Sequence, residues 1–290
     1  MAIQKLCPYT ATELGAEGEI NREHVTPIAI GAPECFYVQS HKEFNSRWND
    51  EIDGPFSNDE CIRFLAMANN VESRSGDVVS RVSGKVSETA DDITLEFSRG
   101  GLDVYFKQPV SKRTNAYTVK GYGDKAAREA DKLILNLQKK GHIVERGEHI
   151  SIQKPTISAS LSMNTELAFK QLIKTAYLYT VWCLGDDAIV TENSQQYLDA
   201  MSGGKITSTN LVLSNSLQGF HQFTLLVIDG TAYCEVDLFG VLRGIFVTNL
   251  RQSVDIFARH SRIDLKRREL IEVTDLVKLL QQYASQMKFS

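Results

Sequence analysis

Residues 23–31 read EHVTPIAIG and residues 44–53 read FNSRWNDEID, and these two segments decide how the N-terminal part of the chain is interpreted. They place an acid next to a histidine, an asparagine 21 residues after that histidine, and another acid eight residues later. Histidine is the natural base near neutral pH. Carboxylate and amide oxygens are the ligands that a hard divalent ion prefers, and such an ion can polarise a phosphoryl oxygen. The residue types therefore suit a one-metal phosphodiester hydrolase.

The hydrophobic pattern around these segments predicts two strands followed by a helix. Short strands are expected over residues 20–25 and 35–38. Three apolar residues spaced four apart, starting at Phe44, form one stripe of a helix over residues 42–52. The Gly-Pro pair at 54–55 is expected to end that helix. Neighbours on a regular strand point to opposite faces, so the adjacent acid and histidine can serve one site only where the strand is distorted.

The same residues resemble a known family. REHVTP at residues 22–27, with Ile-Gly at 30–31, is similar to the (D/E)-H-(I/V)-x-P opening of HNH endonucleases. FNS at residues 44–46 resembles the segment with which these enzymes enter their helix, and EIDGP at 51–55 resembles the acidic end of that helix. The resemblance covers about residues 5–60. It implies an N-terminal ββα-metal HNH core and a metal-dependent endonuclease that hydrolyses phosphodiester bonds in DNA.

The resemblance implies a role for each residue of the motif. His24 would be the general base, and Asn45 would tie down the ββα loop and orient that histidine. Glu23 and Asp53 would hold one divalent ion, Mg²⁺ or Mn²⁺. Two arginines that lie close by in sequence are expected to contact phosphate. The candidate site residues are His24, Asn45, Glu23, Asp53, Arg22 and Arg47.

Simpler interpretations compete with these roles. A Glu-His pair on a strand is most often a surface or structural feature. Asn45 could be a helix N-cap. Asp53 belongs to one polar run with residues 49–51, and its spacing from Asn45 is the reason for choosing it. Two rival functions follow, namely a catalytically inactive HNH-like module that binds nucleic acid and an interaction protein.

The cysteines argue against a structural zinc ion. Many HNH enzymes carry paired cysteines for zinc, one of them directly before the asparagine, but this chain has Phe44 there. We therefore expect no structural zinc, and we expect Tyr37, Phe44 and Trp48 to supply the packing instead. Scattered single cysteines also indicate reduced thiols, as in the cytoplasm. The five cysteines are Cys7, Cys35, Cys61, Cys183 and Cys234.

The rest of the chain predicts a larger mixed domain, so the expected fold class is α+β. The polar, Gly/Ser-rich residues 73–88 are expected to form a loop that ends the nuclease core. The domains would then be residues 1–85, the HNH-like core, and residues 90–290, an α+β domain for target or partner recognition. Helices are expected over 58–70, 124–140, 164–184 and 275–287. Strands are expected over 92–107 (two), 211–213, 223–228, 231–239 and 244–248.

Composition narrows the expected partners and location. A net charge of −4 and a pI near 5.9 argue against broad electrostatic adhesion to nucleic acid, although a locally basic face would still allow DNA as the partner. The N-terminal residues lack the pattern of a secretory signal, and the most apolar run is too short to cross a bilayer. We therefore expect a soluble cytoplasmic protein that has no membrane partner. The sequence leaves homo-oligomers open.

Overall fold

The computed structural model describes residues 4–15, 18–73, 76–77, 79–98, 101–114, 116–122, 124–145, 147, 156–189, 192–209, 211–213, 219–250 and 256–273. The chain divides into two compact units. The first unit combines Met1–Val78 with Met163–Ser290, and the second unit is Val79–Ser162. Both contain helices and strands, so the predicted α+β class is confirmed.

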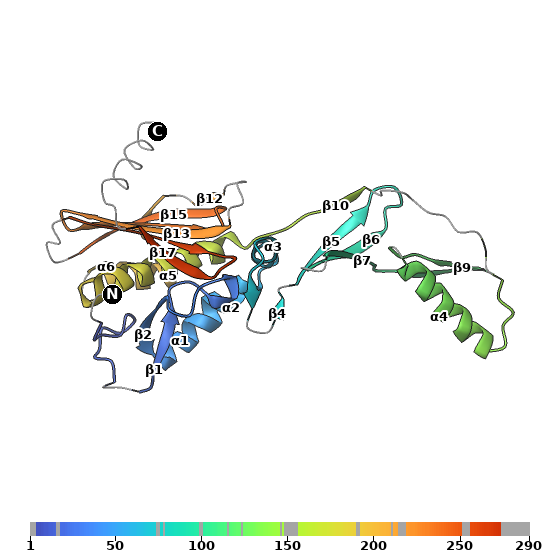
Figure 1. The fold of residues 1–290 in the computed structure, drawn as a ribbon, viewed down its shortest axis with the longest axis horizontal. Helices are drawn as coiled ribbons and strands as arrows, with labels where there is room; N and C mark the ends of the chain where they lie inside the picture. The colour runs from blue at the N-terminus through green and yellow to red at the C-terminus, as the bar shows by residue number, and fades with distance from the viewer. Residues whose placement is uncertain are drawn as a thin grey trace. The chain divides into compact units, whose positions relative to one another are not determined.

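The first unit begins with a strand–strand–helix element (Figure 1). Strand β1 (Ile20–His24) pairs antiparallel with β2 (Tyr37–His41), and the short 3₁₀ turn η1 (Ile28–Ile30) lies in their connection. Helix α1 (Lys42–Trp48) starts directly after β2. This is the order of elements that the hydrophobic pattern predicts.

The helical segment after α1 is longer than predicted. A π-helical turn, η2 (Asn49–Asp53), follows α1, and α2 (Gly54–Asn58) and α3 (Glu60–Ala68) come next. The expectation that the Gly-Pro pair ends the helix is therefore wrong. Pro55 lies in the first turn of α2, directly after the π-helical turn, in which the Gly54 N–H donates to the Asn49 carbonyl oxygen. Trp48, the last residue of α1, and Ile52, within the π-helical turn, are both buried in the core.

Helix α5 (Thr165–Leu184) runs through the centre of the first unit. The side chain of Asn164 caps its start by accepting a hydrogen bond from the Leu167 N–H, and Gly185 ends it. Every residue from 171 to 184 is buried, as its all-round apolar sequence predicts. The turn η3 (Gly185–Ala188) and helix α6 (Glu192–Met201) follow it.

An antiparallel sheet covers one side of α5, and the strand–strand–helix element covers the other (Figure 1). The sheet order is β11-β15-β14-β13-β16-β17, with β12 also paired to β15. Its β13–β14 hairpin turns at Asp229 and Gly230, both with positive φ as a type I′ turn requires. The strands are β11 (Thr207–Ser208), β12 (Val212–Leu213), β13 (Phe220–Ile228), β14 (Thr231–Leu238), β15 (Leu242–Asn249), β16 (Ile256–Asp264) and β17 (Glu269–Val273).

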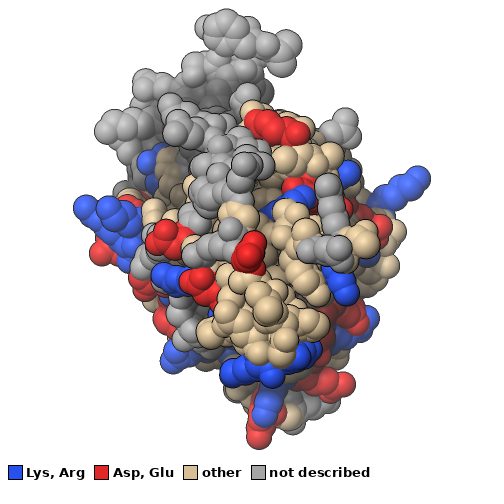
Figure 2. All heavy atoms as spheres, turned by 90° about the vertical axis from the view of Figure 1, so that its right-hand side faces the viewer, with Lys and Arg blue, Asp and Glu red and all other residues tan. Residues whose placement is uncertain are grey.

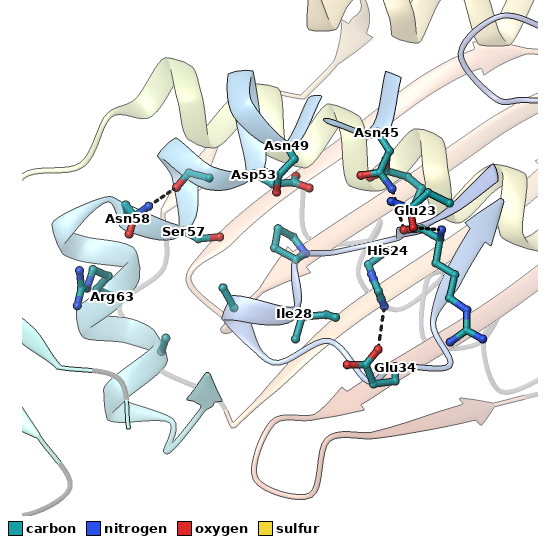
Figure 3. A pocket seen from close by; sticks show the side chains of 16 residues that line it. Glu23, His24, Ile28, Glu34, Asn45, Asn49, Asp53, Ser57, Asn58 and Arg63 are labelled. Atoms are coloured by element: carbon teal, nitrogen blue, oxygen red, sulfur yellow. Dashed lines mark hydrogen bonds and ion pairs between the residues drawn. The ribbon is translucent and has the colours of Figure 1, made fainter. Parts of the chain in front are cut away.

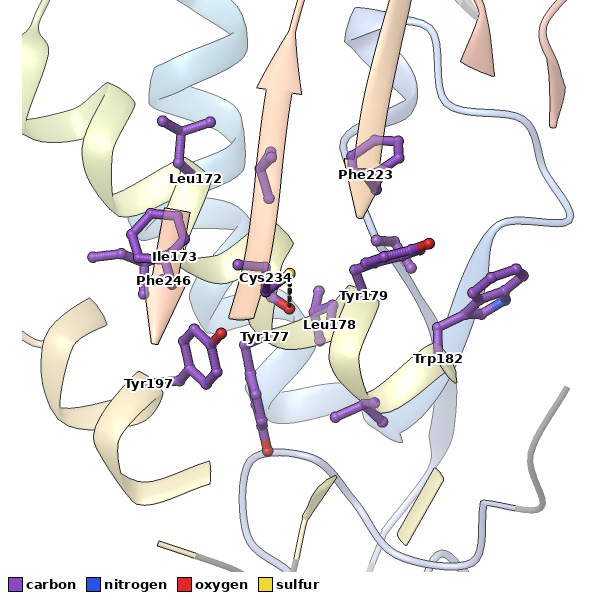
Figure 4. Packing of buried hydrophobic residues seen from close by; sticks show 14 of the residues in the cluster. Leu172, Ile173, Tyr177, Leu178, Tyr179, Trp182, Tyr197, Phe223, Cys234 and Phe246 are labelled. Carbon is purple, nitrogen blue, oxygen red and sulfur yellow. Dashed lines mark hydrogen bonds between the residues drawn. The ribbon is translucent and has the colours of Figure 1, made fainter. Parts of the chain in front are cut away.

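Aromatic side chains fill the space between α5 and the sheet (Figure 4). The Phe223 ring lies 5.4 Å from the rings of both Phe36 and Tyr179, measured between centroids. On the other side of α5, Tyr177 stacks on Tyr197 with centroids 5.3 Å apart. Rings from β13, α5, α6 and the loop before β2 therefore form one continuous core.

The second unit has a small core of its own. Its sheet has the order β10-β5-β6-β7, and Val82, Val86, Ile93, Leu95 and Val104 are buried in it. A separate hairpin and helix α4 accompany this sheet, whereas the short β3–β4 pair belongs to the first unit. The elements are β3 (Glu72–Ser73), β4 (Gly76–Asp77), β5 (Ser80–Val86), β6 (Asp92–Ser98), β7 (Gly101–Phe106), β8 (Val110–Arg113), β9 (Ala116–Val119), α4 (Lys125–Lys139) and β10 (Ile157–Ala159).

Two sequence expectations differ from this arrangement. Residues 80–86 were expected in a loop, but they form β5, because Ser80, Val82 and Val86 alternate inward with polar residues that face outward. The domain boundary predicted between residues 85 and 90 therefore falls inside the β5–β6 hairpin. The helix expected over 275–287 lies outside the described residues. Among the described helices, none is long and apolar enough to cross a membrane.

The aromatic core leads to a stability prediction. Replacing Phe223 by Ala removes a fully buried ring, and we expect the free energy of unfolding to fall by about 3–5 kcal/mol. Leu213→Ala is the control, because that side chain is 57% exposed, and we expect a change within about 0.5 kcal/mol. Urea denaturation followed by circular dichroism measures both. Equal effects of the two substitutions would contradict this packing.

Candidate functional site

A polar pocket of about 760 Å³ lies at the strand–strand–helix element (Figure 3). Strand β1, the loop around η1 and the helical segment from α1 to α3 all contribute to its wall. Polar side chains dominate this lining, so the pocket suits a polar or charged ligand. They are Asn21, Arg22, Glu23, His24, Glu34, Asn45, Asn49, Asp53, Ser57, Asn58 and Arg63.

The structure brings five of the six candidate residues to this pocket. Arg47 does not line it. The Arg47 Nε donates instead to Glu51 Oε1 at 2.9 Å on the surface of the helical segment, and its guanidinium lies over the Trp48 ring. Of the polar run that competes with Asp53, only Asn49 also lines the pocket.

His24 and Glu23 lie on opposite sides of β1, as alternation along a strand requires. The Glu23 side chain is buried and faces α5, whereas the imidazole of His24, the last residue of the strand, faces the loop before β2. The His24 Nε2 lies 3.6 Å from Oε2 of Glu34 (Figure 3). Both side chains reach one pocket because β1 ends there.

Asn45 joins α1 to β1. Its Nδ2 donates a hydrogen bond of 2.8 Å to the carbonyl oxygen of Arg22, two residues before His24. Since α1 begins at Lys42, Asn45 lies inside the helix and is not its N-cap. The contact fixes the backbone of β1 just before the residue that presents the imidazole.

A buried lysine links the two predicted metal ligands. The Lys174 Nζ lies 2.7 Å from Oε1 of Glu23 and 2.6 Å from Oδ2 of Asp53. The Lys174 and Glu23 side chains are 1% and 2% exposed, and Asp53 is 13% exposed. We call these three residues the ion triad. It connects β1, η2 and the middle of α5.

Sequence reasoning missed Lys174 and Glu34. Glu34 stands in the loop GAPEC, where nothing in the local pattern distinguishes it. Lys174 did leave a signal, because it is a single charge in the otherwise apolar run QLIKTAYLYTVWCL. A buried charge must be paired, so a charge at the centre of a fully buried helix predicts acidic partners, although not which ones.

The electrostatics of the ion triad are set by burial. Burial is the largest cause that raises the pKa of Glu23 to about 7; the Lys174 ammonium opposes this rise and the Asp53 carboxylate adds to it. Burial alone would lower the pKa of Lys174, but the Asp53 and Glu23 carboxylates raise it above its usual range. Lys174 is therefore a cation at neutral pH, and the pKa of Glu23 lies close to neutrality.

The ion triad does not fit the predicted one-ion site. Each carboxylate gives one oxygen to the ammonium, so a divalent ion shared by both carboxylates would lie next to the Lys174 Nζ. Two positive charges 4 Å apart repel by about 4 kcal/mol per pair of unit charges at an effective dielectric constant of about 20. In the part of the chain that is described, no cluster of three or more His, Cys, Asp or Glu side chains could hold a metal.

Comparison with known proteins adds no family. The chain matches no protein-family model, no curated protein and no solved structure. The geometry of the pocket, together with the charge distribution along the chain, therefore carries the functional argument.

The raised pKa of Glu23 predicts a pH dependence of stability. The pKa of this carboxyl rises from 4.5 to about 7 on folding, so between these values the folded state binds more protons than the unfolded state. The stability that this proton contributes is complete below pH 4.5 and is lost as the pH rises through 7. We expect the free energy of unfolding of the parent chain, relative to Glu23→Gln, to fall by up to about 3 kcal/mol across this window.

Denaturant unfolding of both chains at several pH values measures this difference. Glu43→Gln, which removes an exposed carboxyl from α1, serves as the matched control and is expected to follow the parent chain. If the difference between the parent chain and Glu23→Gln stays constant with pH, Glu23 does not hold a proton in the folded state.

Proposed function

We propose that the pocket around His24 hydrolyses phosphodiester bonds in DNA, as an endonuclease of the HNH class. The observation that carries the proposal is the hydrogen bond from Asn45 to the Arg22 carbonyl. It has the form implied by the resemblance to HNH enzymes, in which an asparagine of the helix ties down the element that carries the histidine. The β1–β2–α1 order supports the same proposal.

The proposed chemistry uses His24 as general base. The imidazole takes a proton from the water that attacks phosphorus, the bond from phosphorus to the leaving oxygen breaks, and the leaving oxygen takes a proton from solvent. The imidazolium that forms is stabilised by the Glu34 carboxylate beside its Nε2. Arg22 and Arg63 line the same pocket and suit the negative charge of a phosphodiester. The Mg²⁺ or Mn²⁺ ion stays a prediction from sequence, and no step is assigned to it.

A second candidate function is a catalytically inactive HNH-like module that binds nucleic acid or another protein. One observation favours it, namely that Lys174 forms ion pairs with both carboxylates on which HNH chemistry would depend. The pocket would then be a ligand site on a scaffold. Activity and binding assays separate the two functions.

The charge distribution supports DNA as the partner. The second unit carries 14 Lys and Arg against 10 Asp and Glu, whereas the first unit carries 18 against 26. The excess of positive charge thus lies in the second unit, where it favours contact with phosphates. Figure 2, which looks from the right-hand side of Figure 1, shows Lys and Arg interspersed with Asp and Glu on that face. We propose that the second unit recognises the target or partner.

The proposed activity predicts the effect of removing the base. We expect His24→Ala to slow the nicking of supercoiled plasmid DNA by a factor of about 10²–10⁴, the usual contribution of general-base catalysis. His142→Ala, which removes an exposed histidine of the second unit, should nick at the parental rate. Assays run in Mg²⁺, in Mn²⁺ and in EDTA. If His24→Ala nicks at the parental rate, His24 is not the general base. If the parent chain binds DNA without nicking it, the catalytically inactive HNH-like module is favoured.

The charge distribution predicts which lysines affect DNA binding. Lys107 and Lys112 are exposed in the second unit, and we expect their joint replacement by Glu to weaken DNA binding about tenfold at 0.1 M salt. The dependence of log Kd on log salt concentration should become shallower by about one for each lysine. Fluorescence anisotropy with labelled duplex DNA measures both quantities. Lys205→Glu, at an exposed position of the first unit, is the control, and an equal effect there would contradict recognition by the second unit.

A further inference from the structure

We propose that the Lys174 ammonium is the resident cation of this pocket, holding the position between Glu23 and Asp53 that the sequence predicts for a divalent ion. The parent chain then has no divalent-ion site at these carboxylates, and removing the ammonium opens one. The cleavage assay that tests this inference can be interpreted only if the proposed function is correct. The metal titration does not depend on the proposed function.

The position of the ammonium is fixed by the fold. Lys174 lies in the middle of α5, a helix capped at Asn164 and buried along its last fourteen residues. Its side chain is 1% exposed, so the ammonium cannot withdraw to solvent to make room for an ion. The neighbouring buried polar side chain on α5, Gln171, donates to the hydroxyl of Thr175, one turn further along the helix. The only charged partners shown for Lys174 among the described residues are the two carboxylates.

The charges of the ion triad also favour the lysine over a divalent ion. With both carboxylates ionised, the ion triad has a net charge of −1, and adding a divalent ion beside the ammonium would change this net charge to +1. A divalent ion bound by both carboxylates needs both ionised and retains several waters. Glu23 is 2% exposed, which leaves little room for water at its carboxylate. The Lys174 ammonium therefore suits the buried carboxylates of Glu23 and Asp53 better than a hydrated divalent ion does.

The oxygens that the ammonium does not use define the site that its removal would open. Oε2 of Glu23 and Oδ1 of Asp53 are buried and are not bound by the ammonium, and the Tyr9 hydroxyl lies close enough to the Glu23 carboxylate to oppose the rise of its pKa. Asn45 and Asn49 line the pocket beside them (Figure 3). Four carboxylate oxygens with neighbouring amide groups form the type of ligand set that Mg²⁺ and Mn²⁺ prefer.

The test titrates the full chain with Mn²⁺ at pH 7.5 and follows free Mn²⁺ by electron paramagnetic resonance. We expect the parent chain and Asp53→Asn to bind Mn²⁺ equally, because the parent chain has no Mn²⁺ site at Asp53. We expect Lys174→Ala to bind one Mn²⁺ at least about tenfold more tightly than the parent chain, and Lys174→Ala combined with Asp53→Asn to lose that gain. Lys170→Ala, which removes a partly exposed lysine one turn earlier on α5, should behave as the parent chain.

Two results would overturn the inference. The first is a Mn²⁺ site in the parent chain that Asp53→Asn abolishes, a measurement that needs no lysine variant to fold. The second is a folded Lys174→Ala chain, shown by cooperative thermal unfolding, that binds Mn²⁺ no better than the parent. Where Lys174→Ala does not fold, Lys174→Gln replaces it, with the same expected gain.

Cleavage assays keep this inference distinct from the proposed function. Nicking by the parent chain in EDTA supports both. Nicking that requires Mg²⁺ and is lost in Asp53→Asn leaves the endonuclease standing and overturns the role of Lys174. No nicking in any buffer, together with the expected Mn²⁺ results, overturns the endonuclease and leaves the resident cation supported.

Discussion

The arrangement of the first unit depends on pairing one buried ammonium. Lys174 lies at the centre of a helix with no route to solvent, so its charge requires acidic partners inside the protein. Glu23 and Asp53 supply them from β1 and from the π-helical turn η2. The pairing holds the strand and the turn against α5. The same pairing places the charged side chains of Glu23 and Asp53 in the wall of the pocket that His24 and Asn45 also line.

The aromatic core determines where that ammonium can lie. Helix α5 has the sheet on one side and the strand–strand–helix element on the other, and rings such as Tyr179 and Phe223 fill the space toward the sheet. The side of α5 that faces the N-terminal element is the side that carries Lys174. The widened turn η2 completes the contact, because it brings Asp53 toward α5 while Ile52 stays in the core. Local irregularities of this kind often accompany functional sites.

The same geometry bears on both candidate functions. An imidazole beside a carboxylate, on a strand whose backbone accepts a hydrogen bond from Asn45, suits the general base of the proposed hydrolysis. The ion triad limits that chemistry, because it ties the acids of the pocket to a lysine rather than leaving them to an ion. The first unit carries an excess of acidic residues and the second unit an excess of basic residues, so the DNA contacts that we propose and the pocket belong to different units of the chain.

Local sequence signals determined the elements of this protein. The Asn164 cap and the apolar run after it determine α5, and the Asp229-Gly230 pair determines the β13–β14 turn. The hydrophobic pattern of residues 20–52 determines the strand–strand–helix order. These features arise from contacts between residues close in sequence, which composition and spacing record. Strand β5 was missed because two of its inward positions, Ser80 and Gly84, are not apolar, which hides the alternation.

Only the tertiary structure decided which residues share the pocket and with what charge. Lys174 and Asp53 are 121 residues apart, and no local pattern links them. The sequence marked both acids as ligands for a cation, and folding supplied that cation from α5. Packing of residues 163–290 onto the N-terminal element also decided the two units, because burial of one shared core outweighs order along the chain. A lone lysine in an apolar helix requires an acidic partner, but only the fold determines which acids pair with it.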